Sequence, residues 1–324
     1  MDELNRRQLL ALGGALALGA MRAARGAEPA APPAIAVPDN WKSAPRLPLW
    51  SGKPPGSPSF NPGPVPADWP DSYLRSVATP ELHVFRPARP NGRAFLVMPG
   101  GAYWFVSVVN EGAELAPLLT SRGYMVFVLT YRLPGEGWNV RADVPLQDAQ
   151  RAMRLIRSRA GEYQLDSAKV AALGFSAGGH LAATLATRHS EPSYVATDAI
   201  DALDARPCAA GLIYPVITMQ DQWTHALSRQ LLLGESPSRE QIDRRSAELH
   251  VEADTPPVFL CHAIDDSAVP VENSLRMLSA MRTAKRPVEA HFLQEGEHAF
   301  GIGRPGTPSA QWISLLCAWL ERLA

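Results

Sequence analysis

Val170-Ala171-Ala172-Leu173 runs directly into Gly174-Phe175-Ser176-Ala177-Gly178, which matches the pattern G-x-S-x-G. The apolar run predicts a buried strand, and the leucines that follow the match at helical spacing predict a helix. A strand, a tight turn and a helix form a nucleophile elbow, in which glycines on both sides of the serine let the turn close without Cβ clashes. This stretch therefore predicts that Ser176 is a nucleophile at one edge of a sheet.

Short apolar runs on both sides of this elbow alternate with helical patterns. The runs cover residues 95–98, 125–131, 211–215, 258–262 and 288–293. Between two of them, apolar residues recur at i, i+3, i+4 and i+7 from Ala149 to Ile156, as on one face of a helix. The alternation predicts an α/β fold with a mostly parallel twisted sheet and helices on both faces. Residues 217–256 break the alternation and predict a small helical insertion.

A serine hydroxyl attacks a carbonyl carbon only when a base takes its proton and a third group orients that base. The chain places His298 after the last predicted strand, and Asp265 and Asp266 after the strand before it. Because the carboxyl ends of parallel strands meet at one edge of a sheet, we expect these side chains near Ser176. The order Ser176, Asp266, His298 is the order of a catalytic triad on an α/β-hydrolase sheet.

Two neighbouring carboxylates compete for the orienting position, and spacing alone excludes neither. The D-x-x-V-P arrangement from Asp266 to Pro270 is typical of the acid loop in this fold. We therefore favour Asp266 and expect Asp265 to cap a turn. Two further histidines, His180 in the predicted elbow helix and His262 near a strand end, are expected to form structural hydrogen bonds.

The negative charge that develops on oxygen during acyl transfer requires backbone N–H donors. Pro99-Gly100-Gly101-Ala102-Tyr103 follows the predicted strand at 95–98, and its small residues keep the N–H groups accessible. We therefore predict that the amides of Gly101, Ala102 and Ala177 form the oxyanion hole.

The overall composition excludes several classes of protein. The chain has 324 residues, of which 46% are hydrophobic and 19% charged, and its formal net charge is −1. A near-neutral chain has no field to attract phosphate backbones, so we expect no nucleic-acid partner. No H-E-x-x-H, Walker lysine or Cys/His ligand spacing is present, and Pro305 breaks the G-x-G-x-x-G match that begins at Gly301. The sequence therefore predicts neither a metal nor a nucleotide cofactor.

The first 70 residues differ in composition from the rest of the chain. Arg6-Arg7 precedes an apolar run too short to span a bilayer, which is typical of a twin-arginine export signal over residues 1–27. Residues 28–70 are rich in proline, so we expect an extended arm anchored by its tryptophans. Residues 71–324 would form the catalytic domain. This organisation predicts a periplasmic or secreted protein without a stable membrane anchor.

Several segments together are specific for one branch of enzymes. They are Pro48-Leu49-Trp50, Pro54-Pro55-Gly56, Pro99-Gly100-Gly101-Ala102-Tyr103, Glu111-Gly112, Tyr131-Arg132-Leu133-Pro134, Asp148-Ala149-Gln150-Arg151-Ala152, Gly174-Phe175-Ser176-Ala177-Gly178-Gly179-His180-Leu181-Ala182, Val269-Pro270-Val271-Glu272-Asn273-Ser274 and Gly296-Glu297-His298. With these segments the chain resembles bacterial α/β-hydrolase esterases grouped with acetylxylan esterases and bifunctional feruloyl/acetylxylan esterases. The resemblance implies an ester hydrolase that acts on decorated plant polysaccharide.

The oxyanion segment departs from the hormone-sensitive-lipase-like pattern. Pro99 stands where that pattern has histidine, and Ala102 stands where it has a third glycine. A preference for lipid esters is therefore not implied. Aromatic side chains expected at the active-site end, where a sugar ring could lie on them, are Tyr103, Trp104, Trp138 and Trp223. Packing in the core or in the insertion is the alternative for each of them.

The expected substrate is therefore a small-molecule or oligosaccharide ester, with acetylated xylan fragments favoured. Two alternatives use the same site, namely a prolyl-oligopeptidase-like serine peptidase and a lipase-like carboxylesterase. A third, from a different class, is an inactive scaffold that binds polysaccharide. The oligomeric state does not follow from the sequence.

Overall fold

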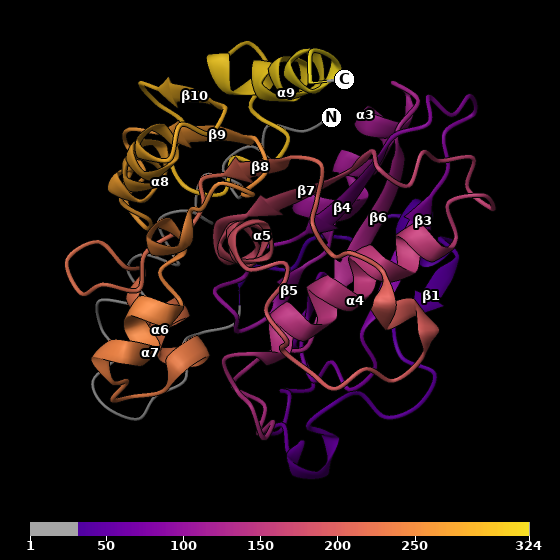
Figure 1. Ribbon diagram of the computed structural model, residues 1–324, viewed down its shortest axis with the longest axis vertical. Helices are drawn as coiled ribbons and strands as arrows, with labels where there is room; N and C mark the ends of the chain where they lie inside the picture. The colour runs from indigo at the N-terminus through magenta and orange to yellow at the C-terminus, as the bar shows by residue number, and fades with distance from the viewer. Residues whose placement is uncertain (1–31, 324) are drawn as a thin grey trace.

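A computed structural model describes residues 32–323, which are built around one eight-stranded sheet (Figure 1). The predicted signal peptide, residues 1–27, lies outside the described residues. In spatial order the strands are β1 (Arg46–Pro48), β3 (Glu81–Phe85), β6 (Met125–Thr130), β4 (Ala94–Met98), β7 (Val170–Phe175), β8 (Ala210–Ile213), β9 (Val258–Ala263) and β10 (Val288–Leu293). A second sheet pairs β2 (Tyr73–Leu74) with β5 (Val106–Ser107).

The six strands from β6 to β10 are parallel, as predicted. β4, β6, β7, β8 and β9 are mostly apolar and buried along their whole length because both faces of the sheet are covered. The edge strand β10 is only half-buried and contains Glu289 and His291. Met98 pairs with Gly174, so the carboxyl ends of β4 and β7 lie level. The loops that leave these ends meet at one edge of the sheet.

The two strands at the β1 edge of the sheet were not predicted. β3 pairs antiparallel with β6, and β1 pairs antiparallel with β3. Because β1 lies within residues 28–70, this proline-rich segment is not wholly an extended arm. Pro48 ends the outermost strand, where no further strand requires the N–H that proline lacks.

Two tryptophans fix the proline-rich segment to the rest of the protein. Trp41 is buried and stacks on His83 of β3, with ring centroids 3.7 Å apart. The Nε1–H of Trp50 donates to Asp148 Oδ1 at 3.0 Å, and the same carboxylate forms a fully buried ion pair with Arg132. The segment is thus held by aromatic side chains that a free linker would not need.

Helices cover both faces of the sheet, with α3 and α9 on one side and α4, α5 and α8 on the other (Figure 1). The helices are α2 (Asp39–Lys42), α3 (Leu115–Thr120), α4 (Val144–Ser158), α5 (Ser176–Thr187), α6 (Ala226–Leu233), α7 (Arg239–Arg244), α8 (Glu272–Thr283) and α9 (Trp312–Glu321). Short 3₁₀ turns are η1 (Ser57–Ser59), η3 (Ala199–Ala202), η4 (Ala247–His250) and η5 (Pro308–Gln311), and η2 (Val109–Ala113) is a π-helix.

Two neighbouring residues of β7 contact helices on opposite faces of the sheet. A Cβ placed on Gly174 would meet Ala182 of α5, whereas the next side chain, Phe175, packs edge-on against Trp312 of α9 with centroids 5.8 Å apart. Successive residues of a strand point to opposite faces, so an uninterrupted apolar run is what a doubly covered strand requires. The predicted α/β-hydrolase fold class is confirmed by this architecture.

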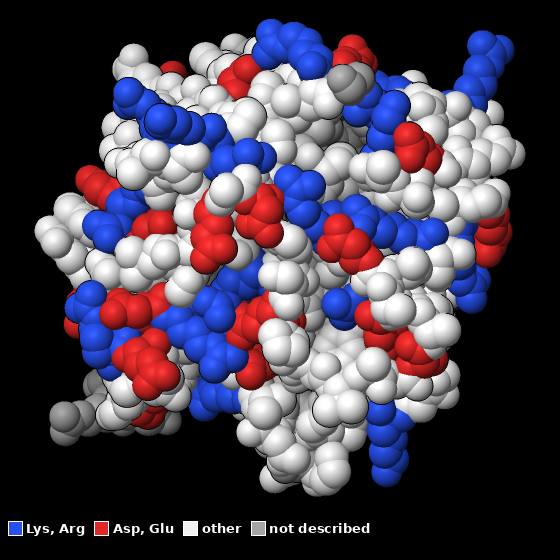
Figure 2. Space-filling view, in the orientation of Figure 1, with Lys and Arg blue, Asp and Glu red and all other residues white. Residues whose placement is uncertain are grey.

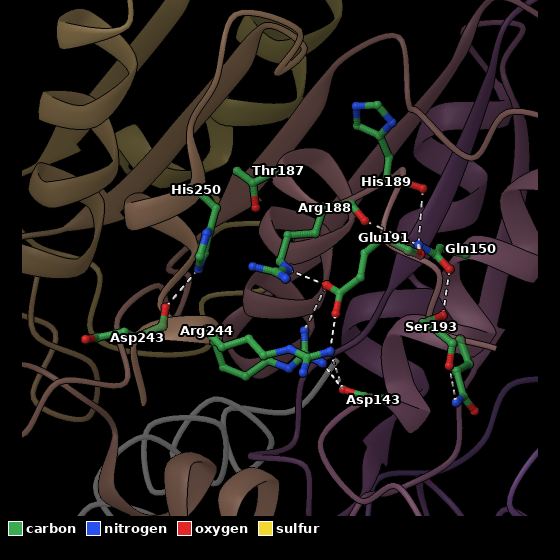
Figure 3. A network of polar contacts seen from close by, with 12 residues as sticks. Asp143, Gln150, Thr187, Arg188, His189, Glu191, Ser193, Asp243, Arg244 and His250 are labelled. Carbon is green, nitrogen blue, oxygen red and sulfur yellow. Dashed lines mark hydrogen bonds and ion pairs between the residues drawn. The ribbon is translucent and has the colours of Figure 1, made fainter. Parts of the chain in front are cut away.

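The predicted insertion, residues 217–256, contains α6, α7 and η4, which lie near α8 at one end of the sheet (Figure 1). Figure 3 shows Arg188, which follows α5, and Arg244, at the end of α7, converging on the carboxylate of Glu191. Burial alone raises the pKa of Glu191, but these two arginines outweigh burial and the net shift is downward. An ion-pair network therefore ties the insertion to the segment that follows α5.

Charged side chains of both signs are interspersed over the face shown in Figure 2, as a formal net charge of −1 allows. Within residues 32–323, no helix is both long and apolar enough to cross a membrane. The same residues contain no group of three or more His, Cys, Asp or Glu side chains that could hold a metal ion.

Candidate active site

Ser176 lies where β7 turns into α5, and it has the backbone conformation of a nucleophile elbow. Its φ is +51°, in the left-handed region that residues other than glycine rarely adopt. Gly178 lets the elbow approach β4, because a Cβ there would collide with the carbonyl oxygens of Met98 and Pro99. The glycine is therefore required by close backbone contact, and the contact sets the height of the serine above the sheet.

Three predicted residues meet at the elbow. Ser176 Oγ lies 2.9 Å from His298 Nε2, and His298 Nδ1 lies 2.7 Å from Asp266 Oδ2. A carboxylate only accepts hydrogen bonds, so the proton of the neutral imidazole sits on Nδ1. His298 Nε2 is then free to accept the proton of the Ser176 hydroxyl. This arrangement can convert a weak nucleophile into a strong one.

Four donors surround the Asp266 carboxylate. Its Oδ1 accepts the amide N–H groups of Ala268 and Val269 at 3.0 and 2.8 Å, and its Oδ2 accepts from His298 and from His262 Nε2 at 3.2 Å. Burial alone raises the pKa of Asp266, but the two histidines outweigh burial and hold this pKa well below its usual range. The carboxylate is therefore charged wherever His298 is neutral.

The geometry distinguishes the two neighbouring carboxylates. Asp265 is exposed, and its Oδ1 accepts the amide N–H of Glu297 at 2.9 Å. It therefore braces the loop before His298, which agrees with the turn-capping role expected for it, and Asp266 is the carboxylate in contact with the imidazole.

The predicted oxyanion segment adopts an unusual backbone. Gly101, Ala102 and Tyr103 have φ values of +120°, +56° and +62°, and the Tyr131 hydroxyl donates to the Pro99 carbonyl at 2.7 Å. Within the described part of the chain, the Gly101 and Ala102 amides donate no backbone hydrogen bond. The amide of Ala177 lies in the first turn of α5, where a helix has no carbonyl to offer it. These N–H groups remain available for a ligand oxygen, and the oxyanion assignment stays a prediction.

Three of the four aromatic residues predicted at the substrate site are buried. Tyr103 is enclosed, Trp104 packs edge-on against Trp69 at 5.1 Å, and Trp138 stacks on Phe60 at 4.3 Å. The packing alternative therefore describes these three residues, because their loops fold down onto the body. Only the fourth, Trp223, is partly exposed.

Two histidines that the sequence placed near the site have defined structural roles. His180 Nε2 faces the carbonyl of Arg245 at 2.7 Å and must donate to it, so His180 Nδ1 accepts from the Tyr103 hydroxyl at 2.8 Å. Burial lowers the pKa of His180 to about 4, so this bridge between the oxyanion segment and the insertion is neutral. His262 also carries its proton on Nε2 and accepts from the Ser274 hydroxyl at 2.8 Å.

Sequence reasoning missed three side chains close to the triad. Glu111 lies beneath the oxyanion segment, and the Tyr214 ring packs edge-on against His298 at 5.1 Å. His225, in the insertion, interacts with the charges of His298 and Asp266, and burial lowers its pKa to about 4. Tyr214 directly follows β8, so the rule that sites form at strand ends could have found it. Glu111 and His225 lie in segments without such a signal.

The fold and the site define the class of protein: an α/β-hydrolase with serine, histidine and aspartate in contact at the carboxyl edge of its sheet. The sequence profile of the BD-FAE family matches residues 82–281, from β3 into α8. The match covers more than half of the chain. The chain belongs to the BD-FAE family.

Two relatives of this chain have names that refer to xylan. The chain is 31% identical over 247 residues to an acetylxylan esterase of Xylanibacter ruminicola. The matched region covers 75% of this chain and 48% of that protein. It is also 36% identical over 207 residues to endo-1,4-beta-xylanase B of Butyrivibrio fibrisolvens. Here the matched region covers 64% of this chain and 32% of that protein. The chain thus spans about a third to a half of the length of these relatives.

A solved structure extends the similarity over nearly the whole fold. An acetyl ester-xyloside bifunctional hydrolase from Caldicellulosiruptor lactoaceticus superposes with a TM-score of 0.72 at 30% identity, covering 86% of this chain and 96% of that one. The predicted resemblance to α/β-hydrolase esterases of the acetylxylan esterase type is therefore confirmed.

Proposed function

We propose that this chain is a serine carboxylic-ester hydrolase that removes acetyl groups from xylan or related sugar esters. The observation that carries the proposal is the contact series from Ser176 Oγ through His298 to Asp266 Oδ2, with distances of 2.9 and 2.7 Å. The named acetylxylan esterase and acetyl ester-xyloside hydrolase support the choice of an acetylated sugar as substrate.

In the proposed reaction, Ser176 Oγ attacks the acyl carbonyl carbon while His298 Nε2 takes the hydroxyl proton. The amides of Gly101, Ala102 and Ala177 hold the negative oxygen that forms. The C–O bond to the sugar then breaks, and His298 gives its proton to the leaving sugar oxygen. Water attacks the acyl-enzyme with His298 again as the base, and acetate leaves Ser176 in its starting state.

The substrate class is tested with acetylated xylo-oligosaccharides, feruloylated oligosaccharides, acyl esters of increasing chain length and an X-Pro amide. We expect kcat/KM for acetate release from the oligosaccharide to exceed that for long-chain esters, since only differences in transition-state binding discriminate substrates. A preference for octanoyl or longer chains would replace the sugar substrate with a lipid-like one. Turnover of the X-Pro amide above all esters would indicate a peptidase.

Trp223 sharpens this test because it is the partly exposed member of the predicted aromatic set and lies two residues before His225. If its ring stacks on sugar, Trp223→Ala should raise KM for the oligosaccharide about tenfold and leave a small acetyl ester within about twofold, the pattern of lost uniform binding. Trp223→Phe keeps a flat ring and should retain most of the affinity. Equal effects of Trp223→Ala on both substrates would make Trp223 a packing residue.

We also propose that residues 1–27 are a twin-arginine export signal, followed by an N-terminal arm over 28–70 and a catalytic domain over 71–324, so that the enzyme works in the periplasm or outside the cell. Replacing Arg6-Arg7 with Lys-Lys should stop export, because the transport route recognises the arginine pair. Unprocessed precursor should then accumulate in the cytoplasm, as detected by fractionation and blotting. Normal export of the Lys-Lys variant would contradict this route.

A further inference from the structure

A buried carboxylate that the proposed reaction does not use lies under the oxyanion segment. Glu111 belongs to the π-helix η2, and its side chain is 3% exposed. Its Oε2 accepts the amide N–H of Gly100 at 2.6 Å, and its Oε1 accepts the Tyr214 hydroxyl at 2.9 Å. Burying a carboxylate without a cation is costly, and π-helices within a chain are frequent at functional sites. This placement therefore requires an explanation.

We propose that Glu111 is a positioning residue for ester hydrolysis, which holds Gly100 and Tyr214 and thereby aligns the oxyanion amides and His298. The inference rests on the proposed function and adds a residue to it. The side chain of Glu111 forms its hydrogen bonds with Gly100 and Tyr214 and with none of Ser176, Asp266 and His298, so it acts through the two groups that it binds.

The two residues that Glu111 binds, Gly100 and Tyr214, each lie next to a group proposed to take part in the reaction. Gly100 precedes the Gly101 and Ala102 amides and lies against the nucleophile, since a Cβ built on it would be 2.9 Å from the Cβ of Ser176. The Tyr214 hydroxyl accepts the amide N–H of Gly301 at 3.2 Å, three residues after His298. One carboxylate thus connects the oxyanion segment to the loop that carries the base.

The two neighbours of Glu111 can both donate to an ionised carboxylate. The Tyr214 hydroxyl donates to Glu111 Oε1 while its oxygen accepts from Gly301, and the Gly100 amide donates to Oε2. Each carboxylate oxygen therefore has a donor beside it, an arrangement that suits the ionised form of Glu111. Burial raises the pKa of Glu111, and the Gly100 amide, the Tyr214 hydroxyl and His298 oppose that rise without reversing it.

The charge of Glu111 also acts on the base. The titratable groups that face His298 are Asp266 after β9, Tyr214 after β8, Glu111 in η2, His225 in the insertion and Ser176 at the elbow. Burial alone lowers the pKa of His298, but the carboxylates of Asp266 and Glu111 outweigh burial, so this pKa is raised. Glu111 thus favours the imidazolium that forms when His298 takes the serine proton.

Glu111→Gln keeps the shape and removes the charge, so that an NH₂ group replaces one acceptor of the network. We expect kcat on an acetylated xylo-oligosaccharide to fall about 10- to 100-fold, with KM within about threefold, because small misplacements of reacting groups reduce the rate by such factors. The acid limb of the pH profile of kcat/KM reports the pKa of His298, which is raised, so we expect this limb above the usual histidine value in the wild type. It should move to lower pH by roughly half a unit or more in the variant, since a nearby anion is lost.

Two further variants separate charge from position. Tyr214→Phe keeps the ring against His298 and the charge of Glu111, but it releases Gly301 and one oxygen of Glu111. It should lower kcat while the acid limb does not move downward. Glu114→Gln neutralises an exposed glutamate three residues from Glu111 and should change neither kcat nor the acid limb.

If the Glu111→Gln protein had the same kcat, the same KM and the same acid limb as the wild type, the inference would be overturned. This holds even if the thermal unfolding temperature of the variant were lower. If Glu111→Gln does not fold, an unchanged kcat of Tyr214→Phe would overturn the inference by itself. A wild-type protein that hydrolyses no ester would overturn the proposed function and this inference with it. An active wild type with unchanged variants contradicts this inference alone.

Discussion

Ser176→Ala is expected to lower ester hydrolysis by roughly 10⁴- to 10⁶-fold while the protein stays folded, because members of a catalytic triad act as one unit. The reason lies in the position of the hydroxyl, which is 2.9 Å from His298 Nε2 at the tip of the elbow. Without the hydroxyl, the imidazole has no alcohol to deprotonate and no acyl-enzyme can form. Only the groups that bind the substrate remain. Steady-state rates on an acetyl ester measure the loss, and His298→Ala should produce a loss of similar size.

Covalent labelling provides a control that does not depend on the choice of ester. A fluorophosphonate should label the wild type and Ser267→Ala, which alters an exposed serine in the neighbouring loop, and should not label Ser176→Ala. Labelling of Ser176 would exclude the inactive polysaccharide-binding scaffold. A folded Ser176→Ala protein that kept most of its activity would refute the proposed mechanism.

Asp266→Asn should lower kcat by about 10⁴-fold, and Asp265→Asn should change it by less than about threefold. An amide at position 266 would turn NH₂ protons toward His298 and His262, which both donate to the carboxylate. The His298 imidazole would then favour the tautomer that cannot accept the serine proton. At position 265, an asparagine still offers an oxygen to the amide of Glu297.

Rates of the two variants under the same conditions decide this assignment. Because the two residues are adjacent and similar in chemistry, each variant is the matched control for the other. A larger loss for Asp265→Asn would transfer the orienting role to Asp265 and would mean that the acid loop rearranges when substrate binds.

Strands with both faces covered were predictable, whereas those that depend on distant partners were not. The run at 170–175 is apolar at every position, so its sequence alone indicates a buried strand. β1 has three residues, one of them Pro48, and β3 contains His83 and Glu81. These strands form because their partners lie alongside, and pairing between distant segments leaves no local pattern in either segment.

The residues proposed for catalysis were predictable for a related reason. Ser176, Asp266 and His298 each follow a strand that could be recognised, so the topology of a parallel sheet places them at one edge. Glu111 approaches from a π-helix whose geometry has no signature in the sequence. The sequence did not reveal that Tyr103, Trp104 and Trp138 are buried, because position along the chain does not specify whether a loop side chain turns outward or inward.

The strand contributed by the proline-rich segment has a consequence for the behaviour of the protein in concentrated solution. Without β1, the outer row of N–H and C=O groups on β3 would be an open template for strands of other molecules. β1 occupies that row, and it is itself a poor template, because it is short and ends in a proline. A chain shortened from its N-terminus past Pro48 would therefore keep its triad but become prone to aggregate through the uncovered edge.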